Sequence, residues 1–140
     1  MNEQKVPAGR GYLRVSVRKA RETLPIEGAF VQIYGSDETG ENSAVLYSLR
    51  TDADGITETV ELSAPPAALS MKPGDPAPYG LYNITVQKDG YGRVENVGVP
   101  VFDGVLSIQP VQLIPLSEFR AGEESEMRIF ETPSGENPLL

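Results

Sequence analysis

The sequence predicts an all-β fold, a seven-stranded antiparallel β-sandwich with a Pro-rich loop and a C-terminal tail. The main observation is a series of short runs in which apolar and polar residues alternate, because alternate residues of a strand face opposite sides of a sheet. The 14 glycines and 12 prolines fall mainly between these runs, where turns are expected. No apolar pattern of helical period extends beyond one turn.

The first three expected strands cover residues 11–18, 29–34 and 44–50. Apolar residues occupy every second position in each run, so one face is expected to lie in the core and the other to face solvent. A bend at residues 24–28 separates the first two runs. The residues with the expected inward parity are Leu13, Val15, Val17, Ala29, Val31, Ile33, Val45, Tyr47 and Leu49.

A tight reversal is expected at residues 51–55. Asp52 and Asp54 have side chains that accept hydrogen bonds from turn amides, and Gly55 supplies a positive φ. The same spacing resembles the opening of a calcium-binding loop. Such a loop requires a Glu at its twelfth position, where this chain has Ser63. A capped hairpin turn is therefore the preferred interpretation.

The fourth expected strand covers residues 56–62 and contains a conflict. Glu58 has the same parity as the apolar Val60 and Leu62, which predicts a bulge or an exposed strand end at this point. Residues 64–78 contain five prolines, so this segment is expected to be the Pro-rich loop.

Three further runs complete the expected sandwich, over residues 79–88, 97–101 and 105–116. Pro110 lies inside the last run, where it removes a backbone donor and predicts a bulge or an edge strand. The residues with the expected inward parity in the first two of these runs are Tyr82, Ile84, Val86, Val97, Val99 and Val101.

The chain is expected to form one domain with two flanking segments. An N-terminal arm covers residues 1–9, the sandwich covers residues 10–116, and an acidic tail containing Gly, Ser and Pro covers residues 117–140. Part of the tail alternates like a strand, and such a segment can add to a sheet edge of its own chain or of a neighbouring one. The candidate interaction residues of this segment are Met127, Ile129 and Phe130.

Aromatic residues on the first two strands form a second candidate interaction surface. Tyr12, Phe30 and Tyr34 have outward parity and are expected to form an exposed patch that binds a sugar or a protein partner. The alternative is that the loop at residues 64–78 or the tail covers them.

The composition argues against several classes of function. The chain has no histidine, cysteine or tryptophan, and so it lacks the usual general base, the readiest nucleophile and the strongest aromatic anchor. We therefore expect no enzymatic activity, no cofactor and no metal site. A formal net charge of −8 argues against nucleic acid and against an anionic membrane surface as partners.

Several motifs together resemble the carboxypeptidase regulatory-like family. They are GYLRVSV at 11–17, LPIEGA at 24–29, TDADGI at 51–56, YNITV at 82–86 and DGY at 89–91. The resemblance covers most of the chain, and it implies a transthyretin-like (prealbumin-like) Greek-key sandwich that acts as a non-catalytic accessory module.

Two other segments, at residues 68–79 and 99–116, look like small domains of clostridial-type bacteria. That likeness implies an association with spore or peptidoglycan proteins.

The function expected from the sequence is that of a structural module that binds a protein partner or further copies of itself. The alternative is an accessory domain that binds glycan or peptidoglycan. Because the N-terminal residues lack the apolar core of a secretory signal, we expect a cytoplasmic location, in the mother cell or spore, or the cell surface if a leader has been lost.

Overall fold

A computed structural model describes residues 9–36, 42–67, 79–120, 122 and 125–131. These residues form eight strands and one short 3-10 helix, and none of their helices is long and apolar enough to span a membrane. The elements are β1 (Gly9–Lys19), β2 (Phe30–Ser36), β3 (Asn42–Arg50), β4 (Val60–Ala64), β5 (Tyr79–Gln87), β6 (Arg93–Phe102), β7 (Leu106–Leu113), η2 (Leu116–Glu118) and β8 (Glu126–Phe130).

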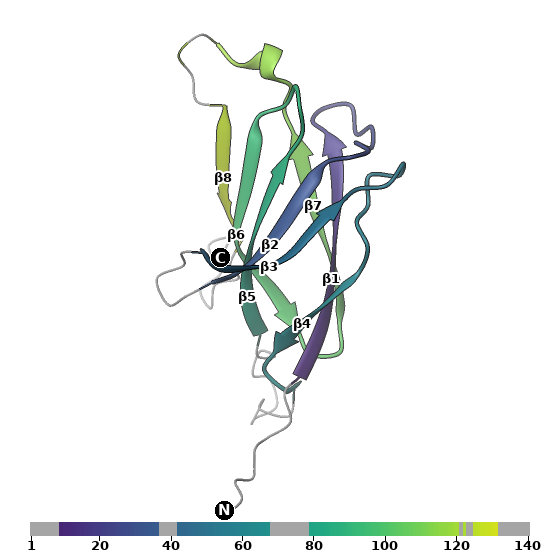
Figure 1. Ribbon diagram of the computed structural model, residues 1–140, viewed down its shortest axis with the longest axis vertical. Helices are drawn as coiled ribbons and strands as arrows, with labels where there is room; N and C mark the ends of the chain where they lie inside the picture. The colour runs from purple at the N-terminus through teal and green to yellow at the C-terminus, as the bar shows by residue number, and fades with distance from the viewer. Residues whose placement is uncertain (1–8, 37–41, 68–78, 121, 123–124, 132–140) are drawn as a thin grey trace, which may run out of the picture.

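The strands form two stacked sheets, which confirms the all-β sandwich (Figure 1). The smaller sheet has the order β4-β1-β7, and the larger has the order β3-β2-β5-β6-β8. Each of the seven expected runs contains a strand. The eighth strand, β8, comes from the C-terminal segment and lies beside β6 in Figure 1.

The expectation of a purely antiparallel sandwich is wrong, because two strand pairs are parallel. β1 pairs with β7 from Tyr12↔Leu106 to Lys19↔Leu113, and β6 pairs with β8 from Arg93↔Glu126 to Val97↔Phe130. A parallel pair requires a long crossover between its strands. Alternation of apolar residues identifies the buried face of a strand but carries no information about its neighbour, so the sequence pattern missed both pairs.

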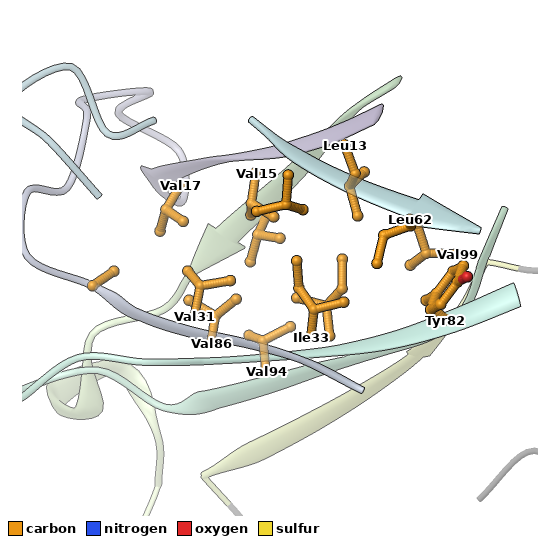
Figure 2. Close-up of a cluster of buried hydrophobic side chains, with 14 of the residues drawn as sticks. Leu13, Val15, Val17, Val31, Ile33, Leu62, Tyr82, Val86, Val94 and Val99 are labelled. Carbon is orange, nitrogen blue, oxygen red and sulfur yellow. The ribbon is translucent and has the colours of Figure 1, made fainter. Parts of the chain in front are cut away.

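The core consists of the aliphatic residues that alternate along the strands. Figure 2 shows Leu13, Val15 and Val17 of β1 facing Val31 and Ile33 of β2 across the space between the sheets. All five are fully buried. Removing this apolar surface from water is the main stabilising contribution to the sandwich.

Local irregularities in the larger sheet correct one predicted core position, Val45, and affect the packing of a second, Val97. Val45 is 50% exposed, because a register shift after Ile33 places it opposite Tyr34 and breaks the alternation of β3. Val97 is buried as predicted, but it lies outside the main core cluster, where the register between β5 and β6 shifts and Gly98 adopts φ +79°. Asn96, which pairs with Ile84, is therefore buried at this level of the sheet.

The fourth strand begins later than the sequence suggests, at Val60. Before it, Thr57 occupies the place of a strand residue beside Val15: its amide donates to the Val15 carbonyl, and its hydroxyl accepts from the Val15 amide, both at 3.0 Å. Glu58 is exposed ahead of the strand, in agreement with the predicted exposed end.

The turn at residues 51–55 is capped as predicted. The Asp52 carboxylate accepts from the amides of Asp54 at 2.8 Å and Ile56 at 3.0 Å, and Gly55 has φ +77°. Pro110 lies in β7, which is an edge strand of the smaller sheet, as its missing amide proton predicted. Most of the expected Pro-rich loop, residues 68–78, lies outside the described residues.

Candidate interaction surfaces

The structure distributes the six predicted interaction residues over three separate surfaces. Tyr12 lies on the outer face of the smaller sheet, and Phe30 and Tyr34 lie on the outer face of the larger one. Met127 and Ile129 line a cleft between β7 and β8. Phe130 points away from that cleft, has 70% of its surface exposed, and lies 5.4 Å from the guanidinium of Arg128.

An exposed apolar surface on the smaller sheet is formed by Tyr12 of β1 together with Leu106 and Ile108 of β7. We call these three residues the β1–β7 strip. Tyr12 pairs with Leu106, and Arg14 pairs with Ile108, so all of these side chains leave the same face of the sheet. Tyr12 is 39% exposed, Leu106 47% and Ile108 52%. Their neighbours of opposite parity in β1, such as Leu13, are in the core.

Three arginines of β1 lie on the same sheet face as the β1–β7 strip. Arg10 forms an ion pair with Glu61 at 3.1 Å, and Arg18 donates to the carbonyl of Thr23 at 2.8 Å. Arg14 lies between them on β1, and its Nε is buried without a hydrogen-bond partner in the described part of the chain. A row of arginines beside an apolar strip fits a partner surface that is apolar with an acidic margin.

Sequence reasoning missed Leu106 and Ile108. The apolar residues of β7 change parity at Pro110, from Leu106 and Ile108 to Val111 and Leu113. Val111 and Leu113 are buried, whereas Leu106 and Ile108 are exposed. The parity change was a signal that both faces of this strand are apolar, but it did not indicate which face the sandwich buries.

The outer face of the larger sheet is more polar. Tyr34 donates to the side-chain carbonyl of Gln32 at 3.0 Å, and the amide of Gln32 donates to Ser48 at 3.4 Å. The guanidinium of Arg50 lies 4.8 Å from the centre of the Phe30 ring. This geometry is a cation–π contact, and it orients the ring of Phe30 at the end of the sheet.

A cavity of about 460 Å³ adjoins Phe30. It combines the two aromatic side chains Phe30 and Tyr91 with several polar and charged groups. Arg93, one of these groups, is ion-paired with Glu126 of β8. The polar and charged lining residues are Arg50, Gln87, Lys88, Asp89 and Arg93.

Phe130 does not join the aromatic residues of β2. It shares the outward direction with Phe30 and Tyr34, but β5 and β6 lie between β2 and β8. Three inter-strand spacings separate β2 from β8, which is roughly 14 Å. The sequence-predicted residues thus do not combine into one site.

Groups suited to catalysis are sparse in the described part of the chain. It contains no cluster of three or more His, Cys, Asp or Glu residues able to hold a metal ion. Burial raises the pKa of Tyr82, whose hydroxyl donates to the carbonyl of Ser63 at 2.6 Å. That tyrosine belongs to the core cluster.

Comparisons with known proteins identify the fold but no family and no activity. No protein-family model matches the sequence, and no curated protein is significantly similar to it. Among solved structures, catechol 1,2-dioxygenase from Acinetobacter radioresistens matches with a TM-score of 0.52 and 15% identity, over 89% of this chain and 58% of that one. The 3-chlorocatechol 1,2-dioxygenase from Rhodococcus opacus matches with a TM-score of 0.50 and 14% identity, over 79% of this chain and 62% of that one.

The TIE protein of Bacillus anthracis is also similar, with a TM-score of 0.45 and 16% identity, over 76% of this chain and 17% of that one. This chain therefore spans less than two thirds of each of these proteins. At such low identity, the similarity to the two dioxygenases establishes a shared fold and carries no assignment of activity.

Proposed function

We propose that this chain is a non-catalytic structural module that binds further copies of itself through the β1–β7 strip, as part of a bacterial spore or cell-wall assembly. The observation that carries the proposal is the exposure of Tyr12, Leu106 and Ile108 side by side on one sheet face. Contiguous apolar surface on a soluble domain is typical of protein interfaces.

Charge complementarity favours a second copy as the partner. The chain carries a formal charge of −8, yet the face that holds the strip presents Arg10, Arg14 and Arg18 beside the acidic residue Glu61. Apart from these three arginines and Glu61, the rest of the chain carries a net negative formal charge, which a second copy would also present. Attraction between the two surfaces would steer association, while burial of the strip would supply affinity.

We further propose that the sandwich is of the transthyretin-like, carboxypeptidase regulatory-like type. The support is the set of motifs at residues 11–17, 24–29, 51–56, 82–86 and 89–91 together with the two-sheet architecture. Members of that family serve as accessory modules, in agreement with a binding role.

Sedimentation velocity over a range of protein concentrations tests the self-association. We expect the wild-type chain to show reversible oligomers, and we expect the double variant Leu106→Ser/Ile108→Ser to shift them toward monomer. Val45→Ser/Leu46→Ser is the matched control, because these residues are 50% and 45% exposed on the edge strand β3. A wild-type monomer at every concentration, or equal weakening by both double variants, would contradict the proposal.

The alternative function is binding of glycan or peptidoglycan at the cavity beside Phe30. The observation that favours it is the combination of Phe30 and Tyr91 with polar groups such as Gln87 and Asp89, because sugars stack on aromatic rings while their hydroxyls form hydrogen bonds. Co-sedimentation with purified peptidoglycan tests this function. Retention that Phe30→Ser abolishes and Tyr12→Ser leaves intact would support it, and absence of retention would exclude it.

A further inference from the structure

A cleft of about 310 Å³ lies between the edge strand β7 of one sheet and the edge strand β8 of the other. Its walls are mostly apolar, with Val111 from β7 and Met127 and Ile129 from β8. Three polar side chains also line it, and they are Asn96 of β6, Gln112 of β7 and Glu131, which directly follows β8. The cleft involves none of the residues of the β1–β7 strip.

Asn96 presents a buried hydrogen-bond acceptor that no described residue satisfies. The residue is 1% exposed, and its Nδ2 donates to the Oε2 of Glu131 at 2.5 Å. Because a carboxylate only accepts hydrogen bonds, this contact identifies the amide atom that faces Glu131 as the nitrogen and leaves Oδ1 as the remaining acceptor. That Oδ1 is buried and has no hydrogen-bond partner among the described residues. Such an acceptor is costly in a folded protein unless a ligand or a water satisfies it.

Glu131 places a negative charge beside the side-chain amide of Asn96. Its amide donates to the carbonyl of Val97 at 2.6 Å, which fixes the backbone, and its Oε2 also accepts from Gln109 at 3.4 Å. Neither Lys nor Arg appears among the described residues that line the cleft. The site therefore combines an unsatisfied acceptor and a carboxylate within an apolar wall.

We propose that the β7–β8 cleft binds an alkylammonium group, the chemistry shared by a lysine side chain of a partner protein and by a free aliphatic amine. An ammonium head carries three donors and one positive charge, so it can donate to both Asn96 Oδ1 and the Glu131 carboxylate. Its methylene stem would lie against Met127 and Ile129, as the stems of lysines commonly lie on apolar surface. The volume is at the lower end of the range for ligand sites, which favours a narrow, unbranched group.

Titration of the full ¹⁵N-labelled chain near pH 7 tests this inference. The probes are hexylamine, hexan-1-ol of matched length, and N-acetyl-lysine methylamide. We expect saturable chemical-shift changes at the Asn96 side-chain amide and at the Met127 and Ile129 amides with hexylamine. Binding of hexan-1-ol should be at least about tenfold weaker, because it lacks the charge that pairs with the carboxylate.

The variant Glu131→Gln should weaken binding of hexylamine by at least about tenfold for the same reason. Glu58→Gln is the matched control, because it removes the same charge from an exposed residue outside the cleft and should leave binding unchanged. Binding of the lysine derivative at a strength similar to that of hexylamine would identify a protein lysine as the natural occupant. Binding of hexylamine alone would identify a free amine.

Three results would overturn the inference. They are equal binding of hexan-1-ol and hexylamine to the wild-type chain, unchanged binding to Glu131→Gln, and the absence of saturable shifts with either amine. The last result would mean that only a water satisfies Asn96. The comparison of the two hexyl probes uses the wild-type protein, so it remains decisive even if Glu131→Gln disturbs β8.

Discussion

The hydroxyl of Tyr82 in β5 donates to the main-chain carbonyl of Ser63 in β4 across 2.6 Å, and this bond joins the two sheets. Tyr47 of β3 makes the equivalent bond to the carbonyl of Glu61 at 2.8 Å. Carbonyl groups of alternate strand residues point to the same side, so the two tyrosines cap the edge of β4 that faces away from β1. Satisfied carbonyls make that edge a poor template for pairing with another chain.

The first prediction concerns the dependence of stability on alkaline pH. Burial raises the pKa of Tyr82 above its ordinary value of 10.0. The folded chain then keeps this proton to higher pH than the unfolded chain, so the contribution of Tyr82 is fully present below pH 10.0 and is lost as the pH rises above it. Tyr82→Phe should lower the free energy of unfolding by about 1 kcal/mol near neutrality. It should also make the decline above pH 10.0 shallower.

Urea unfolding measured at neutral and alkaline pH checks both parts of this prediction. Tyr12→Phe serves as the control, because Tyr12 is 39% exposed and should leave both quantities unchanged. If Tyr82→Phe showed the same alkaline decline as the wild type, the protonated hydroxyl of Tyr82 would have no role in that decline.

The positions of the strands followed from the sequence, because the buried face is formed by regularly alternating branched aliphatics such as Val15, Val31 and Val86. The order of the strands within the two sheets did not follow from the sequence. The parallel pair of β1 and β7 depends on which strands meet after a long crossover, and alternation is the same in parallel and antiparallel pairs.

The candidate sites likewise include one feature that the sequence predicted and one that it did not. Exposure of Tyr12 followed from its parity, opposite to that of Leu13. The pairing of Asn96 with Glu131 arises only because β8 adds in parallel register to β6, with Asn96 opposite Ile129. A contact between two side chains that are distant in sequence depends on strand order, which the alternation pattern did not contain.

The second prediction compares two glycines with positive φ. At Gly90, φ is +88° and a Cβ would meet nothing within 4 Å, so Gly90→Ala should cost only the backbone strain of about 1 to 2 kcal/mol. At Gly55, φ is +77° and a Cβ would lie 2.5 Å from the carbonyl oxygen of Val17. That carbonyl belongs to core strand β1, so Gly55→Ala should cost about 2 kcal/mol more. Chemical denaturation of both variants gives the difference, and equal costs would contradict this account.

The third prediction concerns the turn capped by Asp52. Asp52→Ala removes the acceptor for the amides of Asp54 and Ile56 and should lower the free energy of unfolding by about 1 kcal/mol. Asp54→Ala is the matched control, because the Asp54 side chain is exposed and should be replaceable at little cost.

The same turn resembles the opening of a calcium-binding loop, so calcium is tested as well. Thermal unfolding with and without millimolar calcium should give the same midpoint. Calcium stabilisation of the wild type that Asp52→Ala removes would show that this turn is a metal site.

The fourth prediction concerns local opening of β8. This strand has five residues at a sheet edge, and Met127 is its one side chain packed against the core, whereas the central strand β5 is largely buried. Native-state hydrogen exchange should therefore show β8 amides opening at a lower free energy than those of β5.

Two variants test the role of Met127. Met127→Ala should accelerate exchange in β8 and leave β5 near the wild-type rate. Phe130→Ala, which removes an exposed ring, should change exchange in β8 much less. Exchange of β8 only through global unfolding, at the same free energy as β5, would instead mean that the C-terminal strand is an integral part of the sandwich. The β7–β8 cleft would then be as rigid as the core.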